Sequence, residues 1–282
     1  MARLTANSYG KCDVRLTKVV RTGATHTLWE LTASIILTGD FARIYTNGDN
    51  SPCIPTDTMK NTVYVLAKKN EFGSPEEFGV ILASHFVGRF DHVESDEVSI
   101  AQKIWTRIPA GGRPHDHSFS SAGSGRRTCV VKKTRRGPPR VSGGLAGLEV
   151  IKTTGSGFSG FLKDEYTTLQ ETTDRILATS IDAAWDFLPS ASPDYNAVFE
   201  TAFRVIPETF ATHESLSVQQ TIYAMGEALL ARVPDIATVS FTLPNQHRLP
   251  VNLSPFRLAN ENEIFVATSE PFGLIKGTVA RE

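Results

Sequence analysis

Two places in the sequence combine polar side chains with the start of a predicted helix, and both are candidates for binding an oxygen-rich planar ligand. Thr56 and Asp57 begin one such helix, and Val218 and Gln219 begin another. The first N–H groups of a helix have no partner within it, so they bind anions and carbonyl oxygens. A purely structural role also fits, since Asp57 and Ser215 are residue types that commonly cap helices.

The elements that must position these residues follow from hydrophobic periodicity. Apolar and polar side chains alternate over residues 29–38, which predicts a half-buried strand, and a partner over residues 14–17 would join it across a turn at residues 22–24. The rest of the first half reads as two helices, over residues 57–66 and 75–86, and two strands, over residues 98–105 and 128–133.

The second half repeats this order. Its predicted elements are strands near residues 148–152 and 176–187, helices over 195–210 and 215–232, and strands near 236–241, 249–253 and 274–279. We therefore expect an α+β fold of two ββααββ units, residues 1–142 and 143–282. Pro207 should kink or split its helix, and residues 110–144, rich in Gly, Pro and Arg, should hold mobile loops around one strand.

Composition restricts the class of protein. The chain has 282 residues, of which 40% are hydrophobic and 21% charged, as in ordinary soluble globular proteins. A formal net charge of -1 gives no reason to expect a nucleic-acid partner. No apolar run is long enough for a membrane span, so we expect no membrane partner.

The cysteines and the two ends predict a cytoplasmic location. Cys12, Cys53 and Cys129 are odd in number and widely spaced, which argues against a disulfide framework or a structural zinc site. The sequence shows neither a signal peptide at its start nor a peroxisomal tripeptide at its end.

Several motifs, in order along nearly the whole chain, resemble those of the urate oxidase (uricase) family. They are Tyr9-Gly10-Lys11, the segment Thr56 to Tyr64, Pro114 to Phe119, Asp164 to Leu169, and Leu243 to His247. Any single triplet would mean little, but agreement of all five in one order is specific. The resemblance implies oxidation of urate by O₂ and water, without a metal or other cofactor, to 5-hydroxyisourate and hydrogen peroxide.

The resemblance also implies a role for each site residue. Lys11, Thr56 and His247 would relay protons, which requires Lys11 to lose its proton through desolvation or cationic neighbours. A Thr hydroxyl can accept and donate, and an imidazole titrates near neutral pH. The alternative is a solvated surface lysine and a packed histidine.

The same resemblance assigns the substrate contacts. Arg175 would hold one edge of urate with its planar fork of donors, the Gln219 amide and the Val218 N–H would bind another edge, and Phe158 would stack on the ring. Asn245 would lie with Thr56 where O₂ binds, and Asp57 would lie in the substrate site. The ordinary alternatives are a surface Arg175–Asp174 pair and a core phenylalanine.

The family's architecture is a tandem T-fold, with four chains forming a tunnel-like barrel that has helices outside and active sites at subunit interfaces. Two other functions stay open: a catalytically silent purine-binding barrel, and a pterin-handling T-fold enzyme. Gln219 and the lack of Cys ligands disfavour the pterin enzyme.

Three further patterns have ordinary interpretations. His115 and His117 have the spacing of two metal ligands, with His85 and His92 as possible helpers, but the same pattern occurs in this metal-independent family. Residues 155–160 spell a dinucleotide-binding fingerprint without the helix that should follow. A basic run predicts a solvated loop face, with attraction of anionic urate as a minor hypothesis; it comprises Arg126, Arg127, Lys132, Lys133, Arg135, Arg136 and Arg140.

Overall fold

The structure, a computed structural model, describes residues 2–282 apart from the side chain of Ala122. Contacts divide the chain into two compact units, Met1–Gly144 with Asp194–Asn196, and Leu145–Pro193 with Ala197–Glu282. Two strands, then helices, then further strands follow one another in each unit, so the predicted α+β class and element order are confirmed. The domain boundaries 1–142 and 143–282 stay a prediction.

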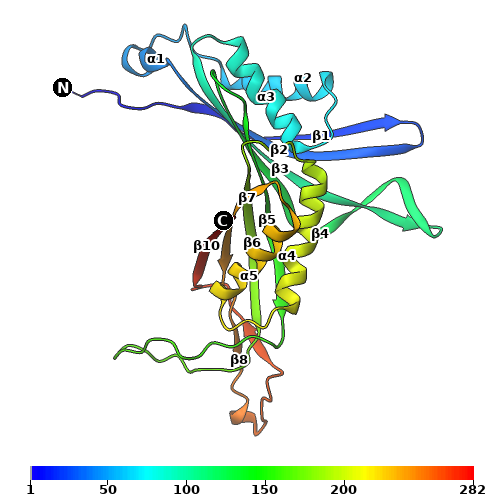
Figure 1. The fold of residues 1–282 in the computed structure, drawn as a ribbon, viewed down its shortest axis with the longest axis vertical. Coiled ribbons are helices and arrows are strands. Elements are labelled where there is room, and N and C mark those ends of the chain that lie inside the picture. The colour runs from blue at the N-terminus through cyan, green and yellow to red at the C-terminus, as the bar shows by residue number, and fades with distance from the viewer. Residues whose placement is uncertain (1) are drawn as a thin grey trace. The chain divides into compact units, whose positions relative to one another are not determined.

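The first unit is an antiparallel sheet covered by helices on one face (Figure 1). Its elements are β1 (Tyr9–Thr22), β2 (Thr25–Gly39), α1 (Ala42–Asn47), α2 (Thr56–Lys69), α3 (Pro75–Arg89), β3 (Val93–Ala110) and β4 (Arg113–Thr134). The strand order is β1-β2-β3-β4. Every second residue of β2, from Trp29 to Leu37, is buried in the core, because side chains on a strand alternate between its two faces.

Local sequence explains how α3 begins and where it packs. The Ser74 hydroxyl accepts the Glu77 N–H at 3.1 Å, and Pro75 occupies the first turn, where its missing N–H costs nothing. Phe78, Leu82 and Phe86 fall on one side of the helix and are fully buried against the sheet.

The second unit is built in the same order, with an excursion before its last strand. Its elements are β5 (Arg140–Lys152), β6 (Leu177–Phe187), α4 (Tyr195–Thr212), α5 (Val218–Arg232), β7 (Ile236–Pro244), β8 (Arg248–Pro250), η1 (Ser254–Phe256), β9 (Phe265–Ala267) and β10 (Leu274–Ala280). The sheet order is β5-β6-β7-β10, and β8 pairs with β9. Helix α5 packs on β7 and β10 so closely that a Cβ on Gly226 would lie 2.5 Å from Val279 Cγ2.

The helix starts correct two expectations. The N-cap of α2 is Pro55, without a side-chain hydrogen bond, so Asp57 lies inside the first turn and is not the cap. The N-cap of α5 is Ser217, whose hydroxyl accepts the Gln220 N–H, so Ser215 is not a cap either. Ser215 is buried two residues before the cap; its hydroxyl donates to the Ser217 carbonyl at 3.2 Å and does not accept from a helix N–H.

Pro207 does not split its helix, since α4 runs without interruption from Tyr195 to Thr212. Proline removes one backbone hydrogen bond and crowds the preceding turn. Buried apolar residues lie before and after Pro207 in the helix, namely Val205, Ile206 and Phe210, and their packing keeps the helix continuous.

Residues 110–144 are mostly strand, so the expectation of mobile loops was wrong. The glycines at 111 and 112 have positive φ angles and form the tight turn from β3 to β4, which then continues to Thr134.

Within the basic run, Arg127 is not solvated: its Nη2 lies 2.7 Å from Glu76 Oε2, and both side chains are almost fully buried. In that pair, burial raises the pKa of Glu76, while the charge of Arg127 acts against the rise.

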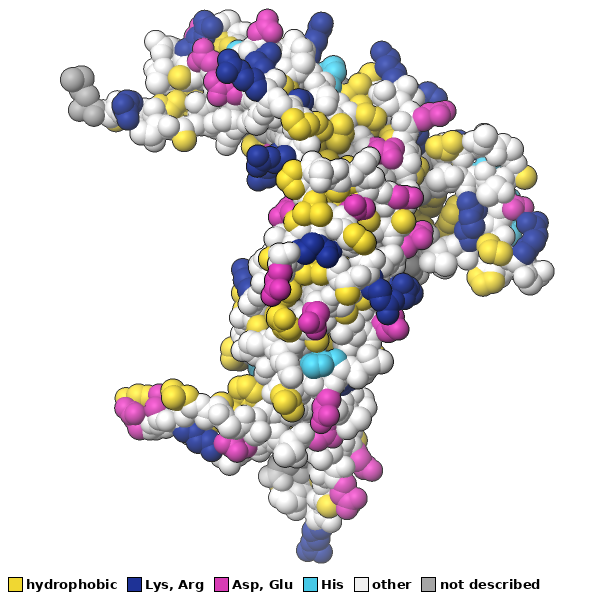
Figure 2. All heavy atoms as spheres, in the orientation of Figure 1, with side chains coloured by type: hydrophobic (Ala, Val, Ile, Leu, Met, Phe, Trp, Pro, Cys, Tyr) yellow, Lys and Arg dark blue, Asp and Glu magenta, His cyan; other side chains and the backbone are white. Residues whose placement is uncertain are grey.

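Among residues 2–282 there is no helix that combines the length and apolar character needed to cross a bilayer. Figure 2 shows Lys, Arg, Asp and Glu side chains interspersed over the visible face, in line with the balanced net charge of -1.

Candidate functional site

In the first unit, Tyr9 holds Lys11 beside the start of α2. The Tyr9 hydroxyl donates to the Ile54 carbonyl at 3.2 Å and accepts the Ile54 N–H at 2.8 Å. Burial raises the pKa of Tyr9 to about 12, so the hydroxyl keeps its proton and both bonds at neutral pH. Lys11 follows Tyr9 by two residues and Thr56 follows Ile54 by two, so the two candidate residues are carried by joined segments.

A β-bulge sets the direction of Lys11. The β1–β2 register shifts between Lys11 and Val14, and Asp13 adopts the left-handed φ of 57° while its N–H bonds the Ser34 hydroxyl at 3.0 Å. Bulges re-aim the side chains beside them. Gly10 is required here, because a Cβ would lie 1.8 Å from the Ile35 carbonyl oxygen.

Thr56 and Asp57 present exposed side chains at the N-terminus of α2. Asp57 makes an ion pair with Lys60 and accepts the Asn61 amide at 2.8 Å. The hydrogen bond and charge of Lys60 lower the pKa of Asp57, and the charge of Lys11 adds a smaller effect in the same direction. Within the described part of the chain, neither the Thr56 hydroxyl nor the Lys11 ammonium has a hydrogen-bond partner.

In the second unit, two loop segments bring Phe158 and Arg175 together. Phe158 and Thr172 exchange both backbone hydrogen bonds, at 2.8 and 3.0 Å, and the Arg175 N–H donates to the Ser156 carbonyl at 2.7 Å. The guanidinium carbon lies 5.3 Å from the centre of the Phe158 ring. Phe158 is only partly buried, so it is not a fully buried core phenylalanine.

The Arg175 guanidinium has a hydrogen-bond donor that no described residue accepts from. Burial lowers its pKa from the usual value, and Nε is buried without a hydrogen-bond partner among the described residues. The alternative role of Arg175, a surface pair with Asp174, is not found among these residues, where the Asp174 carboxylate bonds Thr154 Oγ1 at 2.7 Å. A buried, unsatisfied donor on a cation is energetically costly unless a ligand accepts from it.

The start of α5 lies beside the Phe158 loop. Ser156 and Ser215 form a parallel bridge, in which the Gly157 N–H donates to the Ser215 carbonyl at 2.8 Å and the Ser215 N–H to the Gly155 carbonyl at 3.0 Å. The Thr221 hydroxyl fixes the Ser215 hydroxyl at 2.7 Å. The bridge therefore places the segment leading into Val218 and Gln219 next to the segment that carries Phe158.

Asn245 and His247 lie just beyond β7 and are tied to the start of β6. The Gln246 N–H donates to the Ala178 carbonyl at 2.9 Å, and the Asn245 N–H donates to the Gly273 carbonyl at 2.8 Å. Ala178 follows Arg175 by three residues, so the two groups of site residues share one end of this sheet. Each unit thus gathers its own set: Lys11, Thr56 and Asp57 in the first, and Phe158, Arg175, Val218, Gln219, Asn245 and His247 in the second.

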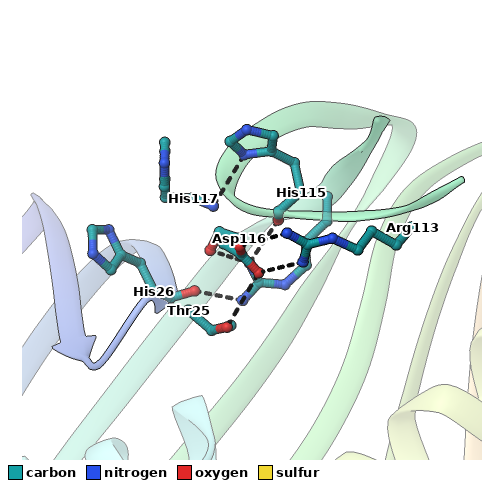
Figure 3. Close-up of polar contacts among 7 residues, drawn as sticks. Thr25, His26, Arg113, His115, Asp116 and His117 are labelled. Atoms are coloured by element: carbon teal, nitrogen blue, oxygen red, sulfur yellow. Dashed lines mark hydrogen bonds and ion pairs between the residues drawn. The ribbon is translucent and has the colours of Figure 1, made fainter. Parts of the chain in front are cut away.

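The histidine pair belongs to a different cluster, at the tips of two hairpins (Figure 3). His117 lies with its ring centre 4.5 Å from that of His115 and 5.6 Å from that of His26. Arg107 donates to the carbonyls of His115 and Asp116 at 3.1 and 2.6 Å, and also to that of His26. No group of three possible metal ligands occurs among the described residues, so His85 and His92 do not join His115 and His117 in a cluster there.

The glycine-rich fingerprint is followed by irregular chain and not by a helix, in agreement with its rejection. Reasoning from the sequence missed the supporting residues Tyr9, Ser156, Ser215 and Thr221. Only Tyr9 carried a signal, through its place in the motif with Lys11. Ser156 and Ser215 act through pairing between distant segments, which spacing along the chain does not encode, and Thr221 acts by bonding Ser215.

Comparison with known proteins decides the family. The family model described as Uricase matches residues 7–132 and 141–276. This chain belongs to the uricase family. A uricase of Arthrobacter globiformis is 43% identical over 276 residues, covering 98% of this chain and 89% of that protein. A uricase of Aspergillus flavus is 41% identical over 295 residues, covering 100% of this chain and 98% of that protein.

The fold of this uricase-family chain also matches solved structures. The crystal structure of the uricase from Arthrobacter globiformis superposes with a TM-score of 0.93 at 42% identity, covering 100% of this chain and 96% of that one. The uricase resemblance of the sequence motifs and the expected fold class are thereby confirmed.

Proposed function

We propose that this uricase-family chain is a urate oxidase. Urate, O₂ and water would give 5-hydroxyisourate and hydrogen peroxide, so that two electrons and two protons pass to O₂ while the oxygen of water joins the purine. Family membership supports this reaction. The structural feature that supports it most is the half-buried Arg175 guanidinium, which lies over Phe158 and has a hydrogen-bond donor without a partner among the described residues.

Substrate binding would use four groups of the second unit. The flat Phe158 ring would stack on the purine, and Arg175 would donate to one edge through its planar fork. The Val218 N–H, unpaired at the first turn of α5, and the Gln219 amide would bind a second edge. Such a set recognises a planar anion with carbonyl oxygens on its rim.

Proton transfer would use Lys11, Thr56 and His247, and O₂ would bind near Thr56 and Asn245. The unpartnered hydroxyl of Thr56 can accept from one neighbour and donate to the next. Asp57, whose charge is already paired with Lys60, would help to orient this edge of the site. Urate deprotonated to its dianion is electron-rich enough to reduce O₂ directly, so the reaction requires no metal or flavin.

We further propose that the active form is a homotetramer with sites at subunit interfaces, in which isolated chains are inactive. Large apolar side chains left exposed on the second unit support association: Leu162 is 92% exposed, Tyr166 82% and Phe256 72%.

A reducing, cytoplasmic compartment fits the three free cysteines. The comparisons favour neither the silent purine-binding barrel nor the pterin-handling enzyme.

The test is an assay with metal-free protein, urate and O₂ that follows loss of urate absorbance and release of peroxide. Arg175→Ala should lose about 2–5 kcal/mol of urate binding if Arg175 is the buried clamp. Arg204→Ala is the matched control, because Arg204 is an exposed arginine of α4 paired only with Glu208. Unchanged urate affinity in Arg175→Ala would remove it from the site, and binding without turnover in the unaltered protein would favour the silent barrel.

A further inference from the structure

The first unit contains a cavity that none of the proposed catalytic residues lines. Its volume is about 320 Å³, and its lining includes Arg15, Thr17, Glu30, Lys103 and Arg126. These side chains belong to β1, β2, β3 and β4, so the cavity spans all four strands of this sheet.

The cavity lies on the sheet face opposite α2 and α3. Leu31, Ile100 and Arg127 are buried on the helix side. Because neighbouring residues of a strand point to opposite faces, Glu30, Lys103 and Arg126 point away from the helices. The cavity is therefore open to a small solute without any rearrangement of the core.

The positive charges of this cavity outnumber the negative ones, with three cationic side chains and one carboxylate in its lining. Lys103 and Arg126 are direct partners in the β3–β4 register, and like charges placed opposite each other destabilise a sheet. Arg15, Lys103 and Arg126 have no ion-pair partner within residues 2–282. The one carboxylate of the lining, Glu30, accepts the Trp105 indole N–H at 2.9 Å.

One of the donors, Lys103, is also held in place. The Lys103 ammonium lies 4.2 Å from the centre of the Trp105 ring, and that indole is fixed by its bond to Glu30. Three cations and two threonine hydroxyls, from Thr17 and Thr32, thus surround one small cavity. Arg and Lys at such a site bind the oxygens of phosphate by charge-assisted hydrogen bonds.

We propose that this cavity binds a phosphate group, as a site separate from the urate site. The net charge of -1 for the whole chain and the small volume of this cavity favour a small anion over a nucleic acid. The group could come from free inorganic phosphate or from a nucleoside monophosphate, and both present the same doubly charged oxyanion.

The test is calorimetric titration of the assembled full-length protein with inorganic phosphate at constant ionic strength. The unaltered protein should bind one phosphate per chain, and Lys103→Gln and Arg126→Gln should each weaken binding about tenfold or more. Lys132→Gln is the matched control, because Lys132 lies on β4 but pairs with Glu97 at 2.9 Å outside the cavity. Its affinity should stay within about twofold of that of the unaltered protein.

Two further titrations distinguish the source of the phosphate group and exclude binding at the urate site. Competition by a nucleoside monophosphate would identify a nucleotide as the source, and its absence would identify free phosphate. Arg175→Ala should bind phosphate normally, so loss of binding in that variant would place the ion in the urate site and overturn the proposal. Lack of binding by the unaltered protein at about 10 mM phosphate, or equal affinity in Lys103→Gln and Lys132→Gln, would also overturn it. Thermal unfolding of each variant checks that it folds.

Discussion

Asp96 should make the stability of this protein fall as pH rises from about 4 to about 8. The side chain is 1% exposed, and neither carboxylate oxygen has a hydrogen-bond partner within the described residues. Burial, with a smaller contribution from the charge of Glu97, raises its pKa from 3.8 to about 8. The folded protein therefore keeps a proton on Asp96 over a pH range in which the unfolded chain has lost it.

The sign and size follow from proton linkage. A raised pKa gives stability that is fully present below the unfolded value of 3.8 and is lost progressively until pH reaches about 8. One pKa unit corresponds to about 1.4 kcal/mol, so the whole loss is about 6 kcal/mol as an upper bound, and about 3 kcal/mol of it falls between pH 6 and 8.

Urea unfolding of the unaltered protein and Asp96→Asn at a fixed protein concentration measures this effect. Relative to the unaltered protein, Asp96→Asn should gain about 3 kcal/mol between pH 6 and 8 and little more above pH 8. Glu97→Gln should retain most of the pH dependence, because burial is the larger cause. Parallel stability curves for the unaltered protein and Asp96→Asn would refute the reasoning.

Three further substitutions test other parts of the structure. Arg127→Met should reduce the free energy of unfolding by about 3–5 kcal/mol, measured in urea, because it leaves the Glu76 carboxylate buried without its ion pair; a loss below about 1 kcal/mol would contradict this. Thr221→Val should raise the KM for urate several-fold more than it lowers kcat, because Ser215 loses the hydroxyl that fixes it; an unchanged KM counts against a positioning role. Gly10→Ala should abolish turnover and lower the melting temperature, since its Cβ meets the Ile35 carbonyl at 1.8 Å, whereas Gly88→Ala, with open space around it, should be neutral or stabilising.

Periodicity was sufficient to predict most of the fold. The alternation in β2 and the apolar spacing in α3 and α5 are local signals, and each of those elements packs its apolar side into a core as such patterns require. The part of β4 before residue 128 could not be foreseen, because much of it is polar and its stability comes from pairing with β3. Pairing between strands is a property of the folded sheet and leaves little trace in one strand's composition.

The site shows the same division. Motif resemblance supplied Lys11, Thr56, Arg175 and the others, but not the contacts that hold them. The burial of Arg127 and Asp96 was also invisible, because charged residues are almost never buried and a sequence does not show their partners. Tyr9 likewise acts on Ile54, which is far away in the chain, so its role becomes visible only when the two segments are side by side.

The way in which Arg107 joins the two hairpin tips has a consequence for sequence drift. Its guanidinium bonds the backbone carbonyls of His26, His115 and Asp116 and none of their side chains. Every amino acid has the same backbone carbonyl, so substitutions at these three positions leave the acceptors for Arg107 in place. Among related chains, the arginine should persist at this place even where the histidines around it have been replaced.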